Sequence, residues 1–215
     1  MEPGLEQALA SLHWLGHAGF CINSAPGPVY IDPFRLTGDK PAAWLLLLTH
    51  DHFDHYSPED AALIRNENTT VVAPESVAAL LGGGKVKAVR PGDELVLDAV
   101  KIKATPAYNI NKDFHPRAKN WVGYLVEIEG ITYYHAGDAD FIPEMKTVRT
   151  DIALLPVSGT YVMTAEEAAL AALAINPSVA VPMHYGSIVG SADDAEYFAR
   201  QLQGKVAARL LTAEK

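Results

Sequence analysis

Short apolar runs recur along the chain and are separated by polar segments that contain glycine and proline. An uninterrupted run such as 45–48 predicts a strand buried on both faces, whereas alternating polarity, as in 100–105, predicts a half-buried strand. In chain order, the predicted strands are 11–15, 19–23, 29–32, 45–48, 70–73, 86–89, 94–97, 100–105, 121–129, 131–135, 151–156 and 178–182.

Helices are predicted where capping residues precede amphipathic segments. Ser57 followed by Pro58 suits an N-cap and the first helical position, and Thr164 with Glu167 matches a capping box. The predicted helices are 57–65, 74–81, 141–148, 164–175 and 191–202. This element order predicts an α/β or α+β fold, and the lack of repeats and linkers predicts a single domain over residues 1–215.

Composition narrows the classes of partner. The formal net charge of −9 argues against a nucleic-acid partner, because phosphate binding requires a basic surface. The longest apolar run, 42–48, is far shorter than the ~20 residues that span a bilayer, so no transmembrane segment is expected. The single cysteine, Cys21, excludes an intrachain disulfide and fits a reducing cytoplasm. The expected partner is a small-molecule substrate, and the oligomeric state is left open.

A cluster of histidines and aspartates follows the apolar run 45–48 directly. His50 and His52 are two residues apart, so in extended backbone their side chains point the same way and can bind one ion. Asp54 and His55 follow where the chain turns towards the next helix, and they can reach a second ion. Imidazole and carboxylate ligands suit zinc, iron and manganese. The cluster therefore predicts a metal site at the end of a buried strand.

The segment Thr49-His-x-His-x-Asp-His55 resembles the signature of the metallo-β-lactamase superfamily. Asp32 before Pro33, the Gly137-Asp138 pair and His184 resemble further motifs of that family. The resemblance implies a four-layer αββα sandwich, two mixed sheets with helices outside. Within the superfamily, the chain resembles small single-domain metal-dependent hydrolases such as the L-ascorbate-6-phosphate lactonase and the N-acylethanolamine-releasing phospholipase D.

The resemblance also implies two divalent metal ions per chain, with zinc favoured and manganese or iron as options. The first ion would be held by one set of ligands, the second by another, and a bridging carboxylate would join them. These ligands are His50, His52 and His115 for the first ion, Asp54, His55 and His184 for the second, and Asp138 as the bridge.

The expected activity is metal-dependent hydrolysis of an ester-type bond, in a phosphodiester or a lactone, by a hydroxide held between the two ions. Asp54 would also be catalytic, because its carboxylate could orient that hydroxide. Two alternatives remain: a redox di-iron protein of the same fold, and a metal-stabilised binding protein without turnover.

Four other residues are candidates for contact with the ligands or the substrate, and their roles are open at this point. Asp32 either accepts a hydrogen bond, from the loop or from the imidazole of a metal ligand, or is a plain turn residue. His17 either faces the metals or is a satisfied turn histidine. His135 is favoured as a core residue or a neighbour of the ligands rather than a ligand. Tyr108 is a substrate candidate in the loop 107–120.

The loop 107–120 lacks periodicity, and a loop of this length in a compact domain is often functional. The hairpin formed by 121–129 and 131–135 would bring the end of this loop back towards Asp138. Its cations Lys112, Arg117 and Lys119 either contact a substrate phosphate or are simply solvated.

Overall fold

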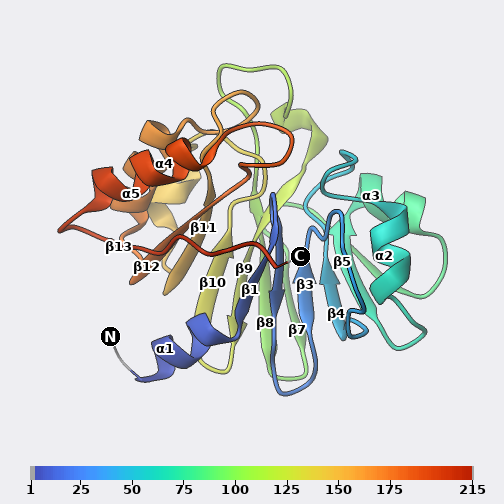
Figure 1. Ribbon diagram of the computed structural model, residues 1–215. Helices are drawn as coiled ribbons and strands as arrows, with labels where there is room; N and C mark the ends of the chain where they lie inside the picture. The colour runs from blue at the N-terminus through green and yellow to red at the C-terminus, as the bar shows by residue number, and fades with distance from the viewer. Residues whose placement is uncertain (1–2, 215) are drawn as a thin grey trace.

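Two mixed β-sheets pack face to face, and helices cover their outer faces, so that the protein is a four-layer αββα sandwich (Figure 1). The computed structural model describes residues 3–214. The first sheet is antiparallel from β1 to β3 and parallel from β3 to β6. In spatial order its strands are β1 (Leu12–Gly16), β2 (Gly19–Ile22), β3 (Val29–Ile31), β4 (Leu45–Leu47), β5 (Thr70–Pro74) and β6 (Lys85–Val89).

The second sheet follows the same plan, with antiparallel pairing from β7 to β10 and parallel pairing from β10 to β13. Its strands also lie in chain order across the sheet. They are β7 (Glu94–Leu97), β8 (Val100–Pro106), β9 (Val122–Ile128), β10 (Ile131–His135), β11 (Ile152–Pro156), β12 (Val179–Met183) and β13 (Ala207–Ala208).

Helices flank the two sheets on opposite sides of the molecule (Figure 1). Helices α2 and α3 cover the first sheet, and α4 and α5 cover the second. The α-helices are α1 (Pro3–Ala10), α2 (Pro58–Ile64), α3 (Glu75–Leu81), α4 (Ala165–Ile175) and α5 (Ala192–Leu202), and the 3₁₀-helices are η1 (Arg117–Lys119) and η2 (Pro143–Thr147). No helix within residues 3–214 is long and apolar enough to cross a membrane.

Strand β4 shows why the apolar run before the histidines has no polar interruption. Leu45 and Leu47 belong to the main core between the sheets, whereas Leu46 packs with Ile64 of α2 in the smaller core outside the first sheet. Successive side chains of a strand point to opposite faces, so every position of this strand is buried. The strand therefore forms a rigid base from which the polar cluster projects.

The predicted strands and most predicted helices are confirmed, and three differences have physical explanations. The predicted helix 141–148 is the 3₁₀-helix η2. Helix α1 was not predicted, although Leu5, Ala8 and Leu9 form an apolar stripe that is buried in the main core. Strand β13 has only two residues and forms by pairing with β12, which no local pattern indicates.

Candidate metal centre

The candidate residues lie in loops at one edge of the two facing sheets. These loops leave the carboxyl ends of parallel strands or link antiparallel ones, and such strand ends are where open sheets bind ligands. The backbone at this edge is unusual, because His17, Asp32 and His184 have φ angles of 52°, 44° and 61°. Positive φ is uncommon for residues other than glycine and clusters at functional sites. Three such residues at one edge indicate that the fold holds their side chains in specific directions.

The first group of potential metal ligands consists of His50, His52 and His115. A nitrogen of each ring lies within 4.8 Å of the others. The ring centroids of His50 and His115 are 5.1 Å apart, and those of His52 and His115 are 4.9 Å apart. Burial and the neighbouring imidazoles lower the pKa of His50 and of His52, so both rings favour the neutral form that binds metal.

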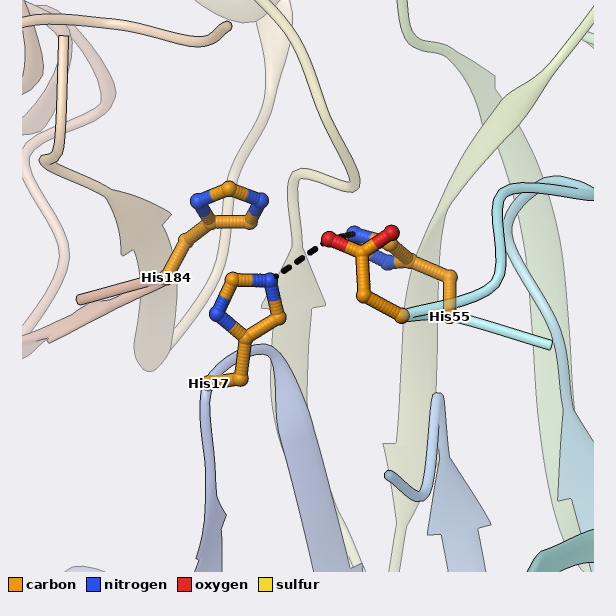
Figure 2. Close-up of side chains that lie close together, drawn as sticks. His17, His55 and His184 are labelled. Carbon is orange, nitrogen blue, oxygen red and sulfur yellow. Dashed lines mark hydrogen bonds and ion pairs between the residues drawn. The ribbon is translucent and has the colours of Figure 1, made fainter. Parts of the chain in front are cut away.

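The second group consists of His17, Asp54, His55 and His184, whose ligand atoms also lie within 4.8 Å of one another. Figure 2 shows that the rings of His17, His55 and His184 approach one space from three separate parts of the fold. His17 Nε2 donates a hydrogen bond of 2.9 Å to Asp54 Oδ2, which the dashed line marks. The structure thus places His17 beside the second set of predicted ligands.

Asp138 lies between the two groups. Its Oδ1 is 3.2 Å from His55 Nε2, and its Oδ2 is 3.2 Å from His115 Nε2 and 3.1 Å from His184 Nε2. Burial alone would raise the pKa of this carboxyl, but the neighbouring His184 and His55 imidazoles hold it well below its usual range. An ionised carboxylate that contacts both groups can bridge two cations.

The inner atoms of this cluster have no hydrogen-bond partner, although they are buried. The unpaired atoms include His50 Nε2, His55 Nε2, His115 Nε2, His184 Nε2 and Asp138 Oδ1. Buried polar atoms are nearly always paired, so converging unpaired lone pairs require another explanation. A bound cation supplies one, and the donor set of imidazole nitrogens and carboxylate oxygens fits zinc, iron or manganese.

The outer nitrogens of the same four rings are anchored. His50 Nδ1 lies 3.0 Å from Thr49 Oγ1, His55 Nδ1 2.7 Å from Asp32 Oδ2, His115 Nδ1 3.1 Å from Asn109 Oδ1 and His184 Nδ1 3.0 Å from Ser158 Oγ. Metal-binding histidines usually bond their second nitrogen in this way, which fixes the ring orientation. The residues present therefore fit a bound metal pair.

Asp32 joins the histidine loop to one of these rings. It is fully buried, and its Oδ1 accepts a hydrogen bond of 2.8 Å from the Thr49 backbone. Its Oδ2 accepts bonds of 2.5 Å from Thr49 Oγ1 and 2.7 Å from His55 Nδ1. Burial alone would lower the pKa of His55, but the Asp138 and Asp32 carboxylates raise it well above its usual value. The same two carboxylates favour a metal cation beside His55.

His135 lies outside both ligand groups. Its Nε2 donates to the Ala18 carbonyl at 2.9 Å, and its Nδ1 accepts a bond of 3.1 Å from the Gly137 backbone. Burial lowers the pKa of His135, which keeps the ring neutral. With both nitrogens paired, His135 holds together the turn that leads to Asp138.

The loop 107–120 contributes His115 to the cluster and directs its other polar groups elsewhere. Lys112 forms an ion pair with the buried Asp140. Tyr108 donates a hydrogen bond of 2.9 Å to Glu144, which also pairs with Arg117 at 3.0 Å. Lys119 Nζ lies 5.7 Å from the centre of the Trp121 ring. Two of the three loop cations are therefore already matched with carboxylates.

A pocket of about 380 Å³ opens directly over the cluster. Four of the potential ligands form part of its lining, namely His52, Asp54, His115 and Asp138, and the rest of the lining is mainly apolar. The apolar lining residues are Phe53, Phe114, Tyr161 and Ile188. A second cavity, of about 360 Å³, lies beside η2 and contains none of the clustered histidines. Of these two cavities, the first is the one in which a small molecule would lie next to the cluster.

The profile of the β-lactamase superfamily domain matches residues 11–184. The chain belongs to the metallo-β-lactamase superfamily. A UPF0173 metal-dependent hydrolase from Thermoplasma acidophilum is 34% identical over 217 residues, with 94% of each chain covered. A solved structure from Parabacteroides distasonis, named as a metal-dependent hydrolase, is 31% identical with a TM-score of 0.84 and covers 94% of this chain and 93% of its own.

Igni18, a metallo hydrolase from Ignicoccus hospitalis, shares the fold with a TM-score of 0.77, at 24% identity and with 95% of each chain covered. These relatives confirm the predicted superfamily, the sandwich fold and the enzyme class of metal-dependent hydrolase. The likeness to the lactonase and phospholipase branches stays a prediction.

Sequence reasoning left His17 undecided and missed the anchors Asn109 and Ser158. The position of His17, directly after Gly16 in the turn between β1 and β2, gave no indication of its bond to Asp54. Asn109 and Ser158 carry no spacing signal either, because each meets its histidine only in the folded chain.

Proposed function

We propose that this member of the superfamily hydrolyses an ester-type bond with a dinuclear metal centre. One observation carries the proposal. Four imidazole Nε2 atoms and a carboxylate oxygen converge in a buried space without hydrogen-bond partners, while the outer nitrogens of the same rings are anchored. Preorganised, unpaired ligand atoms of this kind are the hallmark of a metal site.

Two ligand sets can be assigned to this centre. His50, His52 and His115 would hold the first ion. Asp54, His55 and His184 would hold the second, and Asp138, which contacts both sets, would bridge them. The resemblance to the superfamily favours zinc, and the nitrogen and oxygen donors fit manganese and iron as well.

When bound, a metal pair of this kind acidifies a water molecule and polarises the bond to be cleaved. The protein supplies the positioning. Burial opposes ionisation of Asp54, but the hydrogen bond from His17 and the nearby His55 lower its pKa to about 2. Asp54 is therefore a carboxylate at neutral pH, and its orientation is fixed by His17. We assign it the role of orienting the attacking hydroxide and holding it in line with the bond to be cleaved.

Three further residues, Asp32, Thr49 and His17, position the ligands and do not react. Asp32 and Thr49 lock the loop that carries the ligands, because they bond both its backbone and the His55 ring. The backbone N–H of His184 donates a hydrogen bond of 2.8 Å to the backbone carbonyl of His17, so the main chain also ties the second ligand set together. Such preorganisation holds reacting groups at productive distances.

Other features of the chain support the expected partners and location. The net charge of −9 favours a small-molecule substrate over a nucleic acid. Cys21, the single cysteine, is buried and free, which supports a cytoplasmic location.

The test is reconstitution of metal-free protein. The protein is stripped with chelator, titrated with zinc, manganese or iron, and assayed on a lactone, a carboxylic ester and a phosphodiester. We expect turnover of at least one substrate to rise with added metal and to level off at two equivalents per chain. A protein that binds two ions but hydrolyses none of these substrates would be a metal-stabilised binding protein. Redox activity with iron alone would favour the di-iron alternative.

A further inference from the structure

The walls of the pocket over the metal centre are apolar and exposed. Phe53 is 66% exposed, Phe114 is 48% exposed and Ile188 is 37% exposed. Single exposed apolar side chains are common on protein surfaces, but their concentration around one opening marks a binding surface. A pocket of about 380 Å³ has the size of a small-molecule site.

These walls come from four separate segments of the chain. Phe53 lies within the histidine motif, Phe114 in the loop before β9, Tyr161 in the loop after β11, and Ile188 in the loop after β12. The Phe114 and Tyr161 rings meet edge to face, with centroids 4.7 Å apart. The Phe53 ring makes a similar contact with Phe34 at 5.9 Å. Two supported aromatic pairs thus flank the opening and can hold an apolar group without moving.

Apart from the metal ions, the described part of the pocket lining offers a phosphorylated substrate no cationic side chain. Within residues 3–214, the pocket lining contains no lysine or arginine, and Asp51 adds a carboxylate to those of the metal cluster. Two of the three cations of the neighbouring loop are matched, Lys112 with Asp140 and Arg117 with Glu144, and the third, Lys119, lies over the Trp121 ring outside the pocket lining. Recognition of a phosphate normally uses arginine, lysine or free backbone amides.

The remaining nearby sources of positive charge are also engaged. Arg35 lies over the Phe34 ring at 4.9 Å and donates to Ser187 Oγ at 3.3 Å, outside the pocket lining. Helix α2 begins after the histidine motif, but its first turn carries Glu59 and Asp60, whose negative charges oppose an anion there.

We propose that the substrate is an uncharged carboxylic ester or lactone that presents an apolar or aromatic group to Phe53, Phe114 and Ile188, and that phosphorylated compounds are poorer substrates because the described lining residues supply no cationic side chain for their charge. This inference rests on the proposed function, because it assumes that the bond to be cleaved lies over the metal centre. It narrows the substrate class from ester-type bonds in general to uncharged ones with an apolar substituent.

The experiment compares three γ-lactones with growing alkyl chains: γ-valerolactone, γ-heptalactone and γ-nonalactone. With metal-loaded protein, we expect kcat/KM to rise about fourfold for each added methylene that the pocket covers, since this is the effect of burying one methylene. Bis(p-nitrophenyl) phosphate should be hydrolysed at least about 100-fold less efficiently than the best lactone, a ratio typical of a site without partners for a polar group. A flat lactone series, or a phosphodiester that matches the lactones, would overturn the proposal.

Alanine variants test whether the apolar pocket walls contact the alkyl chain of the substrate. Phe114→Ala and Phe53→Ala should each lower the ratio of kcat/KM for γ-nonalactone to that for γ-valerolactone by about tenfold, while metal content stays at the wild-type value. Leu170→Ala is the matched control, because Leu170 is 52% exposed on α4 and does not line the pocket. An unchanged ratio in both phenylalanine variants would overturn the assignment of these walls.

A binding measurement separates failure of this inference from failure of the proposed function. Phenylacetamide, an uncharged analogue that resists hydrolysis, and phenyl phosphate are titrated into metal-loaded protein and followed by ligand-observed NMR. Phenylacetamide should bind to the wild type and bind about tenfold more weakly to Phe114→Ala. Selective binding without any turnover would sink the proposed function alone. Preferred binding of phenyl phosphate would sink the substrate class, whatever the turnover.

Discussion

Replacement of Asp32 by asparagine tests how the protein orients a ligand from outside the metal cluster. Asp32 accepts three hydrogen bonds in a fully buried position, at 2.8 Å and 2.5 Å from Thr49 and at 2.7 Å from His55. Asparagine keeps the size of the side chain and tolerates the φ of 44° found here. It replaces one acceptor oxygen with an NH₂ donor. In one orientation of the amide, this donor faces Thr49 Oγ1 and the His55 ring; in the other, it faces the backbone N–H of Thr49.

The expected magnitude follows from these contacts. Leaving one or two buried partners unsatisfied costs about 1–3 kcal/mol for each group, so unfolding free energy should fall by about 3 kcal/mol. For a chain of this size, Tm should then fall by about 6–12 °C. Loss of the orienting bond to His55 should weaken metal binding at the second site about 10–100-fold and leave the first site loaded.

The matched control is Asp151→Asn. Asp151 Oδ2 accepts bonds of 2.8 Å and 2.7 Å from the backbone and hydroxyl of Thr132, the same two kinds of donor that Asp32 binds on Thr49, but far from any candidate ligand. Thermal melts and metal titration followed by elemental analysis provide the two readouts. We expect only Asp32→Asn to lose metal, because the amide oxygen of asparagine at 151 can still accept both bonds from Thr132. Equal metal affinity in the two variants would refute the assignment of Asp32 as the residue that orients His55.

Four further outcomes are expected. His115→Ala should lose the first metal and most activity, whereas His135→Ala should retain two ions by elemental analysis because both nitrogens of His135 bond the backbone. Asp54→Asn should lower kcat by roughly 100-fold or more in steady-state assays, and a wild-type rate with one metal bound would refute the dinuclear mechanism. Chelation should lower Tm, since metal in about 1,000-fold excess over its Kd stabilises the fold by about 4 kcal/mol per site. Gly123→Ala should lower unfolding free energy by about 1–3 kcal/mol in denaturant titrations, because the new Cβ would lie 2.5 Å from the His135 carbonyl oxygen.

The strands and the ligand-bearing loop were predictable because their signals are local. The run 45–48 is apolar at every position since both of its faces are buried, and the histidine motif follows it without a gap. Helix termini were predictable for the same reason, because Thr164 and Glu167 form their capping box within one turn.

The remaining parts of the centre depend on contacts between distant segments. His17 bonds Asp54 across 37 positions, and Ser158 supports His184 across 26. The matching of Lys112 with Asp140 likewise depends on the fold, and it decides the charge near the pocket. No periodicity or capping pattern encodes such pairings, so sequence reasoning left these roles open or did not reach them.

An anomalous difference map from crystals of metal-loaded protein, recorded on both sides of the metal absorption edge, tests the dinuclear centre most directly. We expect two peaks about 3.5–4 Å apart. One peak should lie among His50, His52 and His115, and the other should lie beside His55 and His184, with Asp138 between them. A single peak, or two peaks outside these ligand sets, would contradict the dinuclear assignment.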